Sequence, residues 1–180
     1  MALVLNGSAN TLTGLATGGA GIAEAEVIST AALGNNGIIQ VVAPAAYSTV
    51  SEITSTTWTD TGVSASITPR SNSNKILIIV RQSLSVHRNT TAAYAGLRLL
   101  RDSTAILNTT DYSHYGIRAD GNNDRWARMA IPFTYLDAPT STSSITYKMQ
   151  FKGSNANDGP EYKVQDDSSP STIILLEVVA

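Results

Sequence analysis

Histidine is the side chain most often used for acid–base chemistry near neutral pH, and this chain has two, His87 and His114. His114 lies in the run DYSHYG, where Asp111 and Ser113 supply the other residue types of a hydrolytic triad. Triad members meet in space from separate elements, whereas these three are neighbours along the chain. The two histidines are also far apart and have no further ligand cluster beside them, so they predict no metal site. We expect polar loop or interface histidines and a non-enzymatic protein.

The carboxylates of the second half gather in stretches rich in Asn and Gly. GNND and NANDG share their composition with calcium loops but lack the alternating ligands and closing Glu of an EF-hand. Glu161 could pair with Asp166 or Asp167 as in a glycosidase, but we expect all three in one loop. Asn and Asp there more often bond their own backbone in turns, with a bound cation as the weaker alternative. We therefore predict polar turns and no cofactor at Asp120, Asp124, Asp158, Asp166 and Asp167.

One irregular segment combines aromatic and arginine side chains. Exposed Trp and Tyr faces flanked by planar polar groups bind sugars, and Tyr, Trp and Arg are also enriched at subunit contacts. Two interpretations follow, a subunit interface, which we favour, and a glycan site. The residues concerned are Tyr112, Tyr115, Arg118, Arg125, Trp126 and Arg128.

The elements that position these residues are strands. The run ITYKMQFK, residues 145–152, alternates apolar and polar side chains, as a strand with one buried and one wet face does. Short strands separated by SNSN, DGNND and SNANDG are typical of a sandwich or jelly roll. Residues 172–180 are apolar on both faces except at Glu177, which predicts a central strand. The predicted core comprises Ile76, Ile78, Val80, Leu97, Leu99, Met129, Ile131, Phe133, Ile145, Tyr147, Met149, Phe151, Leu175 and Leu176.

The composition changes near residue 45. Residues 1–46 contain no aromatic side chain, no Lys and no Arg, and glycines interrupt them too often for a long helix. We predict an extended attachment arm over 1–45 and a β-sandwich domain over 46–180, so the fold class is all-β, an antiparallel β-sandwich or jelly roll preceded by an extended N-terminal arm. We expect the arm to contact other molecules through Leu3, Leu5, Leu12, Leu15, Ile38, Ile39 and Val41.

The charge content is low. Charged residues make up 14% of the 180 residues, and the net charge is −2, which gives no electrostatic reason to expect a nucleic-acid partner. The chain has no cysteine, so a disulfide scaffold and a thiolate metal site are excluded. Neither a signal peptide nor an apolar run of membrane length is present, which predicts synthesis in the cytoplasm and no membrane insertion.

The order and spacing of several segments resemble a domain of phage tail-fibre and virion structural proteins. The segments are TTWTDTGVSASITPRSNSNKILIIV, LRLLRDSTAIL, FTYLDAPTSTSSITYKMQ and STIILLEVVA, and VLNGSANTLTGLATGG is similar to the opening of such fibre proteins. The resemblance implies a trimeric β-sandwich attached to a virion, and it brings no catalytic or ligand residues.

The sequence therefore predicts a structural component of a bacteriophage virion, a tail fibre or surface appendage. The arm would anchor it to other virion proteins, and the β-domain would form an exposed knob in a homotrimer. The alternatives are a capsid decoration or cement protein and a carbohydrate-binding module that recognises a host surface glycan.

Overall fold

The computed structural model describes residues 4–6, 11–13, 37–88, 92–109, 115–118 and 124–180. The chain divides into two compact units, Met1–Gly37 and Ile38–Ala180. In the first unit, β1 (Val4–Asn6) pairs with β2 (Thr11–Thr13) in antiparallel fashion, with Leu5 opposite Leu12.

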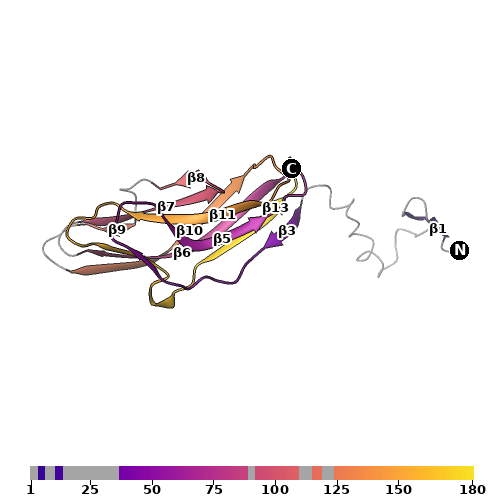
Figure 1. Cartoon of the computed structure of the whole chain (residues 1–180). Helices are drawn as coiled ribbons and strands as arrows, with labels where there is room; N and C mark the ends of the chain where they lie inside the picture. Colours follow the sequence, from indigo (N-terminus) through magenta and orange to yellow (C-terminus); the bar gives the residue numbers. More distant parts are fainter. Residues whose placement is uncertain (1–3, 7–10, 14–36, 89–91, 110–114, 119–123) are drawn as a thin grey trace. The chain divides into compact units, whose positions relative to one another are not determined.

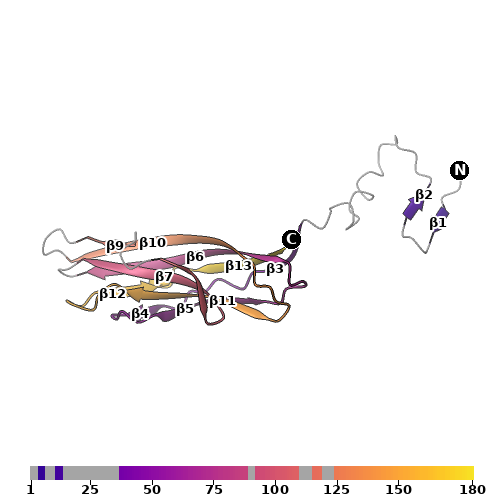
Figure 2. The ribbon, with the colours of Figure 1, turned by 90° about the horizontal axis from the view of Figure 1, so that it is seen from above.

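The second unit consists of two antiparallel sheets packed face to face (Figures 1 and 2). The six-stranded sheet contains β3 (Ile38–Val42), β4 (Ser51–Ile53), β6 (Lys75–Arg88), β10 (Arg125–Asp137), β12 (Glu161–Val164) and β13 (Thr172–Val178). The five-stranded sheet contains β5 (Thr59–Ile67), β7 (Ala93–Arg101), β8 (Thr104–Asn108), β9 (Gly116–Ile117) and β11 (Ile145–Gly153). Helical structure in the described chain is limited to a 3₁₀ turn, η1 (Asp166–Ser168), and no helix there is long and apolar enough to span a membrane.

The strand order is that of a jelly roll. In one sheet the order is β3-β13-β6-β10, and in the other it is β5-β11-β7-β8. Along the chain, β5, β6 and β7 alternate between the two sheets, and so do β8, β10, β11 and β13. Two four-stranded sheets connected in this way form the two Greek keys of the jelly roll. The predicted all-β antiparallel sandwich is confirmed.

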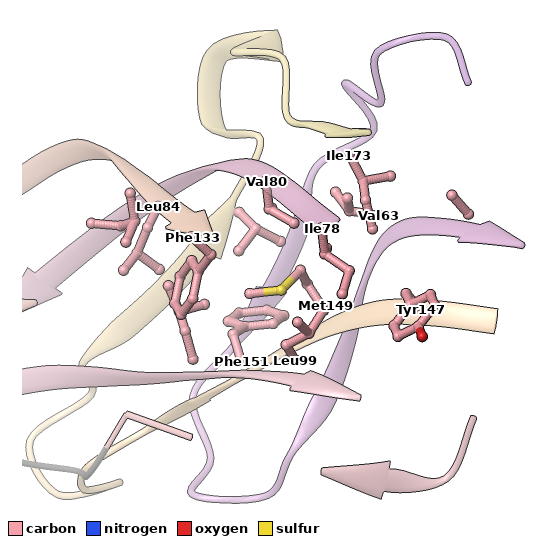
Figure 3. Close-up of a cluster of buried hydrophobic side chains, with 14 of the residues drawn as sticks. Val63, Ile78, Val80, Leu84, Leu99, Phe133, Tyr147, Met149, Phe151 and Ile173 are labelled. Atoms are coloured by element: carbon pink, nitrogen blue, oxygen red, sulfur yellow. The ribbon is translucent and has the colours of Figure 1, made fainter. Parts of the chain in front are cut away.

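The core lies between the two sheets, where the inward side chains of both meet (Figure 3). Phe151, Met149 and Tyr147 on β11 are fully buried, as the alternation in 145–152 predicts. They face Ile78, Val80 and Phe133 of the other sheet, which are also buried. The predicted core is confirmed except at Met129 and Leu176.

Those two residues are only partly buried. Leu175 and Leu176 are consecutive, and successive strand residues point to opposite faces, so only Leu175 can enter the core. Met129 packs against the core from β10, which among the described strands pairs only with β6 and is thus an edge strand of its sheet. Pro132 in the middle of β10 is compatible with an edge, because proline cannot donate to a second neighbour.

β13 lies inside its sheet, between β6 and β3, as its apolar faces predict. Its one charged side chain, Glu177, is fully buried. The turn before β6 provides hydrogen-bond donors to its carboxylate. The carboxylate oxygen Oε1 accepts the backbone N–H of Arg70 at 2.7 Å and the side-chain amide of Asn74 at 2.6 Å.

The unit boundary differs from the predicted one. β3, which the sequence interpretation placed in the arm, pairs with β13 of the same chain, with Val42 opposite Leu175. Val42 also packs against the core. Residues 38–45 therefore include an edge strand of the sandwich, and the division falls between 37 and 38. The paired residues include Ile38 and Val41, two of the predicted arm anchors.

Candidate functional site

The outer face of the six-stranded sheet carries two chemically different regions. Along β6, Ile76, Ile78 and Val80 enter the core, so the residues that alternate with them point outward. At the start of β6 the outward residues are Leu77 and Ile79, and at its end they include Ser85 and His87. Leu77 and His87 are about 33 Å apart, at roughly 3.3 Å per strand residue.

The first region, the apolar rows, lies where β3 joins the sheet. The register places one row across four strands, because Leu136 is opposite Leu77, Leu77 opposite Leu176, and Leu176 opposite Val41. Residues directly opposite in a sheet share a face. In a second row, Ile79 is opposite Ile174. Val41 is 59% exposed, Leu136 51% and Ile79 40%, so the outer face here is apolar and open to solvent.

The second region, the Trp126 cluster, is centred on the stacked rings of Trp126 and His87. These residues are cross-strand partners on β10 and β6, and their ring centroids are 4.3 Å apart with 18° between the planes. His87 is 7% exposed, whereas Trp126 is 41% exposed. Imidazole Nε2 contacts the carboxylate of Asp124, and Nδ1 lies 3.6 Å from Oε1 of Glu161. The histidine thus fixes the tryptophan ring on the sheet surface.

Two cationic side chains lie close to the same ring. The guanidinium carbon of Arg128 lies 5.4 Å from the Trp126 centroid, and Nζ of Lys163 lies 4.9 Å from it, both within cation–π range. Lys163 is held by Glu161 at 2.8 Å and by Glu52 at 3.3 Å. The hydrogen bond from Lys163 to Glu161 is the main cause of the raised pKa of the Lys163 ammonium.

Beside the cluster lies a hollow of about 300 Å³ between β10, β6 and the loop that contains η1. Arg128 Nε donates to Oδ2 of Asp166 at 3.1 Å, and Nη2 lies 3.4 Å from Oδ2 of Asp167. Burial alone would raise the pKa of Asp166, but the hydrogen bond and charge of Arg128 hold it below its ordinary value. The side chains that line the hollow include Arg81, Ser83, Ser85, Arg128, Asp166, Asp167 and Ser169.

The loop over the hollow is held in a strained conformation. Gln165, Asp167 and Ser168 have φ of 56°, 51° and 57°, in the left-handed region that costs a non-glycine residue about 1 kcal/mol or more. Ser171 anchors the far end of the loop, because its Oγ accepts the backbone N–H of Ser83 at 2.8 Å. Strain of this kind is retained where the surroundings fix it, often at binding sites.

The arrangement does not resemble a hydrolytic centre. A histidine oriented by a carboxylate is one part of a triad, but a nucleophile must also reach its ring. Within the described part of the chain, no hydroxyl or thiol is hydrogen-bonded to either nitrogen of His87. Nor do the described residues include a group of three His, Cys, Asp or Glu side chains that could hold a metal ion.

The structure brings together two of the six aromatic and arginine residues singled out in the sequence, Trp126 and Arg128. Arg125 is exposed on β10, and Arg118 is exposed directly after β9. Tyr115 is partly buried and packs against the core. Tyr112 lies outside the described residues, as do His114, Asp120, Leu3 and Leu15. Leu5 and Leu12 lie on the paired strands β1 and β2.

Sequence reasoning missed His87, Lys163 and the two carboxylates of the hollow as members of one site. It also placed Glu161 in a loop with Asp166, which is wrong, because Glu161 begins β12. The sequence does not reveal the strand register. In that register, Trp126 on β10 and Glu161 on β12 both lie opposite His87, one on each neighbouring strand of β6. The alternation EYKV, with Tyr162 and Val164 buried, could have identified this strand.

Comparisons with known proteins give little beyond this geometry. No protein-family model matches the sequence, and no curated protein matches it. Among solved structures, the chain is similar to that of the Gx strain of infectious bursal disease virus, with 15% identity and a TM-score of 0.34. The VP2 subviral particle of the same virus gives the same two values.

These matches cover 78% of this chain and 38% of the viral chains, so this chain spans well under half of their length. The Gt strain of the virus gives 14% identity and a TM-score of 0.32. At such values neither the fold nor the function of the viral proteins can be transferred to this chain. The jelly roll stands on its own strand order.

Proposed function

We propose that this chain is a structural subunit of a virion, a tail-fibre or surface component that assembles as a homotrimer and is attached through residues 1–37. The observation that carries the proposal is the apolar rows on the outer face of the six-stranded sheet. They lie at the edge where β3 follows Gly37, so the surface and the preceding segment are adjacent in the chain.

The physical argument rests on exposed apolar area. A soluble monomer rarely leaves a contiguous apolar patch of several large side chains in water, and such patches mark protein contacts. Here the apolar side chains form two rows on a sheet, one of them across four strands, which gives a continuous surface suited to another subunit. An assembly role also suits the low charge of the chain, 14% of residues.

The virion assignment is supported by the resemblance of the sequence segments to virion structural proteins. The jelly roll is found in viral capsid and lectin domains, which favours the same assignment as an analogy of fold. Residues Met1–Gly37 form a compact unit of their own, as an attachment segment would.

The test compares three variants with the unaltered chain, by sedimentation of the purified proteins and by their presence in particles purified from the infected host that produces this chain. Val41→Asp with Leu136→Asp places two carboxylates in the apolar rows, and deletion of residues 1–36 removes the attachment segment. Thr104→Asp with Asn108→Asp adds the same charge on β8, where both residues are exposed, and serves as the matched control.

We expect the row variant to sediment as a monomer and the deletion to be missing from particles. The control should assemble and be incorporated as the wild type is. The proposal fails if the unaltered chain is absent from particles. Incorporation of the deletion variant would refute the attachment role, and an oligomeric row variant would refute the assembly surface.

A further inference from the structure

The geometry points to a carbohydrate site on the outer face of the sheet, from the middle of β6 to the Trp126 cluster: we propose that the hollow beside Arg128 binds one residue of a neutral glycan and that Trp126 stacks on the next. Along β6, the Trp126 end of this site lies about 30 Å from Leu77 of the apolar rows, and the hollow lies between them, beginning at Arg81. It does not depend on the proposed structural role.

The hollow has the size and lining of a small-ligand site. Its volume of about 300 Å³ is at the lower end of the range for ligand pockets, which suits a single sugar residue. Its lining combines the guanidinium groups of Arg81 and Arg128 with the carboxylates of Asp166 and Asp167. A sugar hydroxyl both donates and accepts hydrogen bonds, so it needs donors and acceptors close together.

The charge of the lining favours a neutral ligand. Arg81 and Arg128 contribute two positive charges, and Asp166 and Asp167 contribute two negative ones, so the sum is zero. Both carboxylates already face Arg128, at 3.1 and 3.4 Å, and this pairing would have to be disrupted before the guanidinium could bind an anion. A polyhydroxylated neutral molecule can instead bond to the outer edges of the existing ion pairs.

Trp126 adds the apolar contact that a sugar ring requires. It lies two residues before Arg128 on the same face of β10, about 7 Å along the strand, which is within the length of a disaccharide. Its ring is 41% exposed, although stacking on His87 and the nearby Arg128 and Lys163 fix its orientation. A ring that is ordered before binding loses little entropy when the ligand arrives.

The loop of the hollow is preorganised in the same way. Asp167 is held with φ of 51° and has a side chain that is 76% exposed, so its carboxylate faces solvent over the hollow. Ser169 closes the turn by donating its backbone N–H to the carbonyl of Asp166 at 3.0 Å. The backbone of the loop thus holds the acceptors of the site in position.

Two variants test the site, and each removes one of its two halves. Trp126→Ala removes the stacking surface, and Asp167→Gly removes the exposed carboxylate while suiting the left-handed backbone. Trp58→Ala is the matched control, because Trp58 also has two cations over its ring, Arg98 at 4.4 Å and Lys152 at 5.0 Å, but does not adjoin the hollow.

The full-length chain is applied to an array of neutral hexose and N-acetylhexosamine oligosaccharides together with sialylated and sulfated ones. The tightest neutral glycan is then titrated against each variant by calorimetry. We expect selective binding of neutral glycans and at least a tenfold loss of affinity in both site variants, with the control unchanged. Thermal unfolding of each variant verifies the fold, and if Trp126→Ala is unfolded, Asp167→Gly decides the result.

The inference is overturned if no neutral glycan binds or if the charged glycans bind more tightly. It is equally overturned if Trp58→Ala weakens binding as much as the folded site variants do. If particles still contain the Trp126→Ala or Asp167→Gly variant but no longer bind the glycan, the glycan site is distinct from the structural role.

Discussion

At the scale of single residues, the two sheets are connected by a buried polar contact. The hydroxyl of Tyr147 on β11 donates to Oδ2 of Asp137 on β10 at 2.7 Å, and Nη1 of Arg101 on β7 donates to both oxygens of Asp137 at 3.1 Å. Tyr147 is fully buried and Asp137 nearly so. Burial is the main cause of the raised pKa of the Tyr147 phenol, and the hydrogen bond to Asp137 adds to it.

This contact predicts a loss of stability in alkali. The phenol ionises near pH 10 in the unfolded chain and only at higher pH in the folded one, so above pH 10 the unfolded state binds fewer protons. The free energy of unfolding should therefore fall, by up to about 1.4 kcal/mol per pH unit from this group. Tyr147→Phe should be about 1 kcal/mol less stable at pH 8 but less sensitive between pH 10 and 11. Urea unfolding of both proteins at the two pH values measures this, and parallel pH profiles would contradict it.

At the scale of elements, the alternation of apolar and polar residues determines what can be predicted. Residues 145–152 alternate cleanly and become β11, with one face in the core. The alternation fails where a strand is apolar on both sides, as at Leu175 and Leu176, because it then does not identify the inner face. The strand β4 contains too few residues to show a period, and β12 shows only the four-residue alternation EYKV. β12 forms because β6 offers it an edge, and β4 forms because β12 offers the next one.

The inner face of β11 provides a direct test of the core. Phe151 is fully buried between the sheets, so Phe151→Ala should lower the free energy of unfolding by about 3–5 kcal/mol through lost contacts and the cavity that remains. Lys152→Ala, at the next residue on the outer face, should cost less than about 1 kcal/mol. Urea denaturation of the two variants measures both values. Equal losses would place Phe151 outside the core.

At the scale of the whole molecule, the site is harder to predict than the fold. The Trp126 cluster and its hollow take His87 from β6, Trp126 from β10, Lys163 from β12 and Asp167 from η1. The jelly roll brings these four elements onto one face, and nothing in their sequence spacing indicates it. The composition change near residue 45 indicated the existence of two units but not their boundary, because β3 is recognised only by its pairing with β13.

The pairing of β3 makes the position of this boundary measurable. A fragment of residues 38–180 retains every strand of the sandwich and should unfold at the same urea concentration as the full chain. A fragment of residues 46–180 lacks β3, which exposes one edge of β13 and removes the contact of Val42 with the core. Burying one such side chain contributes roughly 2 kcal/mol, and the lost strand hydrogen bonds add to this. The shorter fragment should therefore unfold at a lower urea concentration. If the two fragments have equal midpoints, β3 contributes nothing to the sandwich, and the boundary belongs at residue 45.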